Sequence, residues 1–179
     1  MWFMCKRPTG RNLLPALGIM ALILASCGFR PLYQSGGGSV GAALATVEVA
    51  RIKDRSGQQL RMMLTEGLSP QGRSARTDYM LTVSLTESKV SLAIRKDATA
   101  TRASLTIRAV FKLAALHNPN LGTFKGSALS TNGYNILTSD FATLSAERDA
   151  RNRSLRTLAE EIRLRVASAL RNPRSFLAP

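Results

Sequence analysis

Two stretches of this sequence alternate apolar and polar residues with a period of two, and this pattern constrains the fold more than any other feature. The first starts at Tyr79 and keeps its apolar side chains at odd positions through Leu85. The second covers 105–113, where every odd position is apolar. Such alternation is typical of strands with one buried and one open face. The polar stretch between them, 95–102, is the expected tip of a hairpin.

The first alternation changes its parity at its far end, where the next apolar residues are Val90, Leu92 and Ile94. One extra residue in a strand reverses the facing of the side chains that follow it. We therefore expect a β-bulge near 87–89. After the second alternation, a turn is expected at 117–120 because it contains asparagine and proline, and a shorter strand at 122–129.

A strand and a helix are expected before the hairpin. Val47 and Val49 alternate with less apolar neighbours, which predicts a short strand within 45–52. The apolar residues of 57–68 are spaced by three, one and four positions, which is a helical pattern. Ser56 precedes this helix and is its expected N-cap.

The last third of the chain predicts a long helix over 140–171. Ser139 or Asp140 is the expected cap, and Pro173 follows the last turn. Apolar residues recur at helical spacing on one stripe, which consists of Leu155, Leu158, Ala159, Ile162, Val166, Ala169 and Leu170. At 1.5 Å per residue the helix would be about 48 Å long, either continuous or broken near 151–154.

The order of the expected elements is strand, helix, three strands and a long helix. This order predicts the α+β class, as a two-layer sandwich in which a mostly antiparallel sheet of about four strands carries two helices on one face. We expect this domain to cover 45–172 and to be followed by a C-terminal tail at 173–179.

The first 26 residues have the features of a secretory signal that is removed from the mature protein. Lys6, Arg7 and Arg11 supply a positive start, and 13–25 is an apolar stretch. As a helix this stretch would be about 20 Å long, which is short of the ~30 Å hydrocarbon core of a bilayer. A cleaved signal is therefore favoured over a permanent membrane anchor.

The apolar stretch ends in Leu24-Ala25-Ser26-Cys27, which resembles the lipobox of bacterial lipoproteins. In those proteins the cysteine is acylated and becomes the mature N-terminus, so the resemblance implies lipid attachment, including palmitate, at Cys27. Several acyl chains anchor a protein stably, whereas one chain holds it only marginally. Gly28 follows the cysteine where some lipoproteins have aspartate, and this implies sorting to the outer membrane. The alternative is a signal peptide with an incidental cysteine.

Residues 27–44 are expected to form a lipidated tether. Its first part, 28–33, is largely apolar and contains Pro31, which favours an extended path. Its second part, 34–39, is rich in glycine and serine and is typical of a flexible linker. The apolar part is expected to dock on another surface, and the alternative is a linker without a partner.

The charge of the chain points to an anionic partner. There are 25 Lys and Arg against 11 Asp and Glu, which gives a formal net charge of +14. Because little nucleic acid is found outside the inner membrane, we expect lipid phosphates and acidic sugars as the anions, and no nucleic acid. The chain has one histidine, and it has no phosphate-binding loop, metal-binding pair or nucleophile motif. We therefore expect no enzyme, no metal and no cofactor.

Cys27 followed directly by Gly28-Phe29-Arg30-Pro31-Leu32-Tyr33 resembles the start of the mature LptE lipoproteins, which take part in lipopolysaccharide assembly. The β-α-β-β-β-α order is similar to that family over essentially the whole mature chain. Phe141-Ala142-Thr143, which leads into an Ala- and Arg-rich helix, resembles its alphaproteobacterial members.

This resemblance implies a periplasm-facing outer-membrane lipoprotein without enzymatic activity. It would plug an LptD barrel in a 1:1 complex, assist the assembly of that barrel, and take part in inserting lipopolysaccharide into the outer leaflet. The alternative is a small envelope lipoprotein that binds anionic lipid or glycan without a barrel partner.

Five basic residues are the candidates for binding lipopolysaccharide: Arg95, Lys96 and Arg102 at the hairpin tip, and Arg108 and Lys125 on the adjoining strands. The planar guanidinium fork suits phosphate and carboxylate groups. For any one of these residues, an ordinary solvated surface charge is the alternative. The arginines of the last helix likewise have two interpretations, which are contact with an anionic partner and a solvated helix face.

Overall fold

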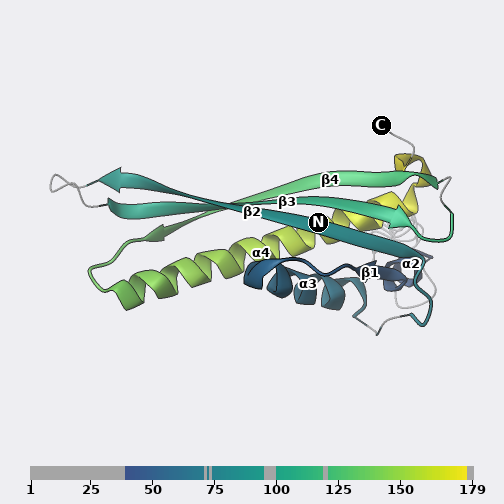
Figure 1. Ribbon diagram of the computed structural model, residues 1–179, viewed down its shortest axis with the longest axis horizontal. Helices are drawn as coiled ribbons and strands as arrows, with labels where there is room; N and C mark the ends of the chain where they lie inside the picture. Colours follow the sequence, from purple (N-terminus) through teal and green to yellow (C-terminus); the bar gives the residue numbers. More distant parts are fainter. Residues whose placement is uncertain (1–38, 71, 73, 95–99, 119–120, 177–179) are drawn as a thin grey trace, which may run out of the picture. The chain divides into compact units, whose positions relative to one another are not determined.

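Strands β1 to β4 form one mixed sheet, and helices α3 and α4 lie on one of its faces (Figure 1). The computed structural model describes residues 39–70, 72, 74–94, 100–118 and 121–176. In chain order the elements are α2 (Ser39–Ala45), β1 (Val47–Val49), α3 (Asp54–Leu68), β2 (Tyr79–Ile94), β3 (Ala100–Ala115), β4 (Thr123–Asn135), α4 (Asp140–Arg171) and the 3-10 helix η2 (Pro173–Phe176). The predicted α+β sandwich is confirmed, and α2 is a further helix within the segment expected to be a tether.

The strands lie in the sheet in the order of the sequence, β1-β2-β3-β4. β1 runs parallel to β2 and pairs Val47 with Tyr79, whereas β2, β3 and β4 are antiparallel neighbours. A parallel pair needs a crossover connection, and α3 supplies it between β1 and β2. Because β1 has only three residues, it covers only the start of β2.

The predicted bulge near 87–89 is wrong, because the charged middle of β2 faces the helices in an unbroken register. The pairing with β3 is continuous up to Ser91, and the register shifts only between Ser91 and Ile94. Glu87 and Lys89 therefore lie on the same side of the sheet as the buried Leu81 and Val83 of this strand. Val90 lies on the opposite side and is exposed. The change of parity in the sequence reflects the charged Glu87 and Lys89 on the helix side. Both residues form ion pairs with residues of α4.

β3 occupies the middle of the sheet, and its helix-facing side chains form the centre of the core. The buried side chains of this strand are Ala103, Leu105, Ile107, Ala109, Phe111 and Leu113. Phe111 lies opposite Gly126 of β4, where an added Cβ would lie 2.5 Å from Phe111 Cζ. The absence of a side chain at Gly126 therefore makes room for the aromatic ring.

α4 packs its apolar stripe against the sheet and against α3. The predicted residues Leu155, Leu158, Ala159, Ile162, Val166 and Ala169 are all buried, and Leu170 is half-buried. The helix is continuous from Asp140 to Arg171, so there is no break near 151–154. The Ser139 hydroxyl accepts a hydrogen bond from the Ala142 amide at 3.4 Å, which confirms the predicted N-cap.

α3 begins at Asp54, three residues earlier than predicted, and Ser56 is not its N-cap. Lys53 occupies the N-cap position and makes no side-chain cap hydrogen bond. The Ser56 hydroxyl instead donates to Glu87 Oε1 of β2 at 2.7 Å. The first turn of α3 is thus attached to the sheet through a side chain and is left without the usual cap.

Both ends of the described chain contribute to the core. Leu44 of α2 and Phe176 of η2 are both buried. The Phe176 ring lies 6.1 Å from the Tyr79 ring and 6.3 Å from the Phe124 ring, measured between centroids. Gly122 has a φ of 78° and passes so close to the Phe176 carbonyl oxygen that a Cβ would lie 2.3 Å from it. None of the helices formed by the described residues combines the length and apolar character of a membrane span.

Candidate functional site

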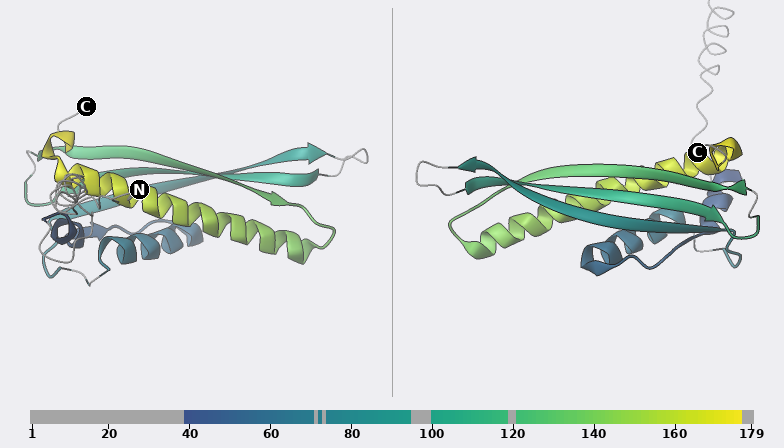
Figure 2. Two further views of the ribbon diagram at one scale, coloured as in Figure 1. Left: turned by 180° about the vertical axis from the view of Figure 1, so that it is seen from behind. Right: turned by 45° about the horizontal axis from the view of Figure 1, so that its top comes forward.

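The side of the sheet that points away from the helices is covered by no other described element (Figures 1 and 2). We call this side the open face. Because side chains alternate along a strand, its residues follow from the register of β2, β3 and β4. They are mainly small hydroxyl residues with a few apolar and cationic ones, and they include Thr82, Ser84, Thr86, Ser88, Val90, Arg102, Ser104, Thr106, Arg108, Val110, Lys112, Lys125, Ser127, Leu129 and Thr131.

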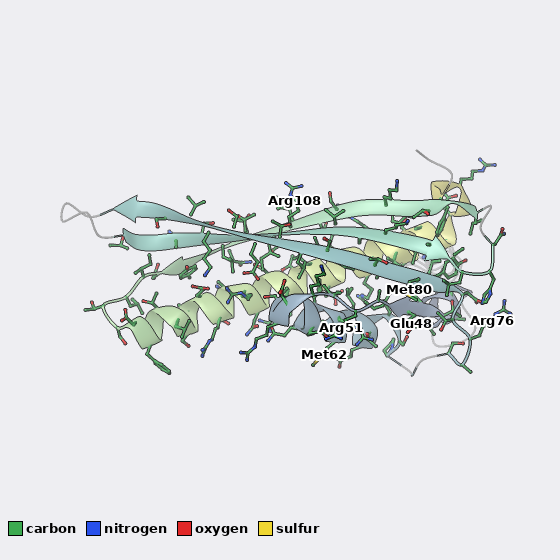
Figure 3. All side chains as sticks on the ribbon, in the orientation of Figure 1. Glu48, Arg51, Met62, Arg76, Met80 and Arg108 are labelled. Atoms are coloured by element: carbon green, nitrogen blue, oxygen red, sulfur yellow. The ribbon has the colours of Figure 1, made fainter. Side chains whose placement is uncertain are left out.

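On the open face, cationic side chains lie opposite each other with no carboxylate between them. Lys112 of β3 is directly opposite Lys125 of β4, and like charges in this position repel. Arg108 projects from the same face, away from the helices (Figure 3). Strands β2, β3 and β4 place no carboxylate on this face. The open face is therefore positive and suits an anionic partner.

Three of the basic residues expected to bind lipopolysaccharide, Arg102, Arg108 and Lys125, lie on this face but do not form one cluster. Arg95 and Lys96 lie outside the described residues. Arg102 lies at the outer end of β3, six residues from Arg108, or about 20 Å along the strand. Lys125 lies four further pairs along, about 13 Å beyond Arg108. Their spacing suits contact with an extended partner and does not form a site for a single phosphate.

On the helix side, charged and polar residues join the outer half of β2 and β4 to α4. We call this group the polar seam, and it consists of Glu87, Lys89, Tyr134, Glu147 and Arg151. Arg151 Nη2 lies 2.7 Å from Glu147 Oε1, and its Nε lies 3.2 Å from Glu87 Oε2. Lys89 forms an ion pair with Glu147, and the Tyr134 hydroxyl donates to Glu147 Oε2 at 3.4 Å. Glu147 is thus the centre of the polar seam.

The contacts in the polar seam favour the charged forms of Glu147 and Arg151. The hydrogen bond from Lys89, followed by that from Arg151, lowers the pKa of Glu147 against the effect of burial. Burial tends to lower the pKa of Arg151, but its hydrogen bonds to Glu147 and Glu87 outweigh this and raise it. Burial, and next the Glu147 carboxylate, raise the pKa of the Tyr134 hydroxyl. The ion pairs are therefore intact at neutral pH.

β4 continues to Asn135, beyond the predicted end at residue 129, because its polar second half finds polar partners on the helix side. The Asn132 amide donates to Ser154 Oγ at 2.8 Å and to Ser130 Oγ at 3.3 Å. Ser154 and Ser130 are both buried. An apolar pattern cannot identify this part of the strand, because hydrogen bonds and not apolar contacts hold it against α4.

A groove with a volume of about 580 Å³ lies beside the polar seam, between the start of α3, β2 and α4. We call it the α3–α4 groove. Its charged lining residues are Lys53, Asp54, Arg55, Glu87, Arg148 and Arg151. Glu87 is already bound by Arg151 and Ser56, whereas Lys53, Arg55 and Arg148 make no ion pair with a described residue. Sequence reasoning missed this groove, because its lining residues are far apart along the chain.

His117, the single histidine, lies in the turn after β3 and is exposed. Its Nε2 lies 3.0 Å from the Thr77 carbonyl oxygen and 3.9 Å from Asp78 Oδ1. Within the part of the chain that the structure describes, no three His, Cys, Asp or Glu side chains are grouped so that they could hold a metal ion.

Comparison with known proteins relates the chain to one family. A family model described as "LptE: Lipopolysaccharide-assembly" matches residues 44–166. A comparison with curated protein sequences found no match.

Two solved structures have a similar fold. A putative lipoprotein from Caulobacter crescentus is 23% identical, with a TM-score of 0.61 over 75% of this chain and 97% of that one. An uncharacterized lipoprotein B from Nitrosomonas europaea is 13% identical, with a TM-score of 0.54 over 71% of this chain and 84% of that one. Because the matched region contains all four strands, α3 and most of α4, the chain belongs to the LptE family of lipopolysaccharide-assembly proteins.

Proposed function

We propose that this protein is a non-enzymatic outer-membrane lipoprotein that binds inside an LptD-like β-barrel in a 1:1 complex. In this position it assists the assembly of the barrel and takes part in inserting lipopolysaccharide into the outer leaflet. Membership of the LptE family supports the assignment to lipopolysaccharide assembly. The open face is the observation that supports a barrel as the partner.

The composition of the open face suits the interior wall of a barrel. The lumen of an outer-membrane barrel is polar, and small hydroxyl side chains let a polar wall approach a sheet closely. The opposed Lys112 and Lys125 destabilise the free domain, and carboxylates of a partner would neutralise them. Val110 and Leu129, both exposed, add apolar contacts to this surface. We expect the barrel wall facing them to carry acidic residues.

Lipid attachment at Cys27 is the second part of the proposal. Cys27 lies outside the described residues, and its assignment rests on the lipobox pattern. The Cys27→Ala variant is expected to lose the incorporation of labelled palmitate, while a variant at the other cysteine, Cys5→Ala, keeps it. Equal labelling of the Cys27→Ala variant and the unaltered protein would contradict attachment at this residue.

The five basic residues predicted from the sequence are proposed to contact lipopolysaccharide along the sheet. Arg95, Lys96 and Arg102 would do so at the outer end of the hairpin, and Arg108 and Lys125 along the open face. Their spread favours a series of weak, salt-sensitive contacts with phosphates and acidic sugars. Such contacts suit passage of the glycolipid better than its tight retention.

The test of the proposed function is a detergent extraction of outer membranes with the protein tagged at its C-terminus. We expect one large barrel protein to co-purify in equal amount. The double variant Lys112→Glu/Lys125→Glu should lose the barrel, because it reverses the charge of the open face.

The matched control for this extraction is Arg156→Glu/Arg171→Glu, which reverses two exposed charges of α4 and should retain the barrel. Recovery of the unaltered protein alone, from membranes that contain the barrel, would contradict the proposal. That result would favour a lipoprotein that binds anionic lipid or glycan without a barrel.

A further inference from the structure

The apolar stripe of α4 extends beyond the helix that covers it. α4 has 32 residues and α3 has 15, and the first turns of α4 project past the start of α3 (Figures 1 and 2). From the buried Leu155, the same stripe continues toward the N-terminus through Arg148, Leu144 and Phe141 at helical spacing. Phe141 is 78% exposed and Leu144 is 44% exposed, and Leu137 just before the helix is 50% exposed. We call these three residues the apolar end.

The uncovered stripe leads directly into the α3–α4 groove, because Arg148 belongs to both. Four cationic side chains line the groove, two from the start of α3 and two from α4, against two carboxylates. One of these carboxylates, Glu87, is already bound by Arg151. The first turn of α3 adds amide groups that no side chain caps. The groove therefore offers donors and positive charge that are not used within the described residues.

An apolar surface next to a positive groove is complementary to an amphiphilic anion, which has an apolar part and a negatively charged part. Phe141 and Arg148 are seven residues apart, which is about 10 Å along the helix. In a phosphorylated and acylated glycolipid, such as the lipid A part of lipopolysaccharide, the phosphate and the acyl chains are joined to the same sugar unit. An acidic peptide would match the cations but would leave Phe141 and Leu144 uncovered.

We infer that the α3–α4 groove binds a phosphate of such a glycolipid, with the apolar end in contact with its acyl chains. This inference rests on the proposed function, because lipopolysaccharide assembly brings the glycolipid to this protein. The groove lies on the helix side of the sheet, whereas the barrel is proposed to bind the open face. The protein can therefore hold the glycolipid and the barrel at the same time.

The test measures binding of the full mature chain to phosphatidylcholine vesicles that contain lipid A. We expect Arg55→Ala/Arg148→Ala to bind about tenfold more weakly, because two charge-assisted contacts are lost. Phe141→Ser/Leu144→Ser should also bind more weakly, whereas the matched surface control Arg156→Ala/Arg171→Ala should bind as the unaltered protein does. Thermal unfolding of each variant verifies that the domain is folded.

Two further vesicle compositions identify the ligand chemistry. Vesicles with dephosphorylated lipid A should bind the unaltered protein and Arg55→Ala/Arg148→Ala equally weakly. Vesicles with phosphatidylglycerol should show a much smaller difference between these two proteins than lipid A does. An equal difference for both lipids would overturn the inference in favour of a general affinity for anionic surfaces.

Variants of the open-face residues test whether the glycolipid binds there and not in the α3–α4 groove. If Arg55→Ala/Arg148→Ala binds lipid A normally and Arg102→Ala/Arg108→Ala does not, the glycolipid site lies on the open face and the inference is wrong. Co-purification of the barrel is measured on the same variants and should be unchanged in the groove variant. If no barrel co-purifies with the unaltered protein, the proposed function is refuted. Normal lipid A binding by Arg55→Ala/Arg148→Ala refutes only this inference.

Discussion

Glu147 joins the outer half of the sheet to α4, and the Glu147→Gln variant tests this role. The substitution keeps the size of the side chain and removes its charge. Lys89 then loses its ion-pair partner, Arg151 loses one of two, and the hydrogen bond from the Tyr134 hydroxyl to a carboxylate oxygen is weakened. The apolar core beneath β3 is unaffected, so the variant should fold and differ only in stability.

The size of the effect follows from how far the partners are buried. Removing one partner of a buried ion pair costs about 3–5 kcal/mol, and an exposed pair contributes about 0–1 kcal/mol. The side chain of Glu147 is 16% exposed, but that of Lys89 is 49% exposed and remains hydrated after the change. Arg151 also keeps Glu87 at 3.2 Å. We therefore expect a loss of about 1–2 kcal/mol in the free energy of unfolding.

Equilibrium unfolding in urea measures this difference. The midpoint should fall for Glu147→Gln without a change in the slope, because the surface exposed on unfolding is the same. The control is Asp149→Asn on the same helix, whose pair with Arg153 is largely exposed and should contribute less than about 0.5 kcal/mol. Equal midpoints for Glu147→Gln and the unaltered protein, or equal losses in both variants, would refute this reasoning.

Three further predictions follow from the described contacts. The pKa of Glu147 is lowered from its ordinary value of 4.5, so its stabilising effect is complete above that value and is lost as the pH falls through the lowered folded-state pKa. The difference in Tm between the unaltered protein and Glu147→Gln should therefore disappear in strong acid. Gly126→Val should cost about 1–3 kcal/mol in urea unfolding because its side chain would collide with Phe111, whereas Gly133→Val, on the open face, should have little effect. Lys125→Thr should stabilise the free domain by about 0.2–1 kcal/mol in thermal unfolding, because it removes a like charge opposite another lysine, and should weaken co-purification of the barrel.

The elements with a clear apolar period were predicted closely from the sequence. The bounds expected for α4 agree with the observed Asp140–Arg171, and β2 covers the whole stretch that the alternating pattern indicated. In these elements one apolar side is buried against another, so the period alone determines which side faces the core.

The errors occur where polar residues pair between the sheet and the helices. Glu87 and Arg151 are 64 residues apart, and neither residue alone indicates that the other will meet it. For that reason a bulge was expected where β2 is regular, and Ser56 was expected to cap a helix when it binds Glu87. The α3–α4 groove was missed for the same cause, whereas the positive charge of the open face follows from residues on neighbouring strands.

The central claim is that this protein acts in lipopolysaccharide assembly at the outer membrane. The most direct test is to deplete the protein in cells and to measure the fraction of lipopolysaccharide that can be labelled on the surface of intact cells. The account predicts that this fraction falls on depletion, and that the unaltered gene restores it whereas Lys112→Glu/Lys125→Glu does not. An unchanged surface fraction after complete depletion would contradict the account.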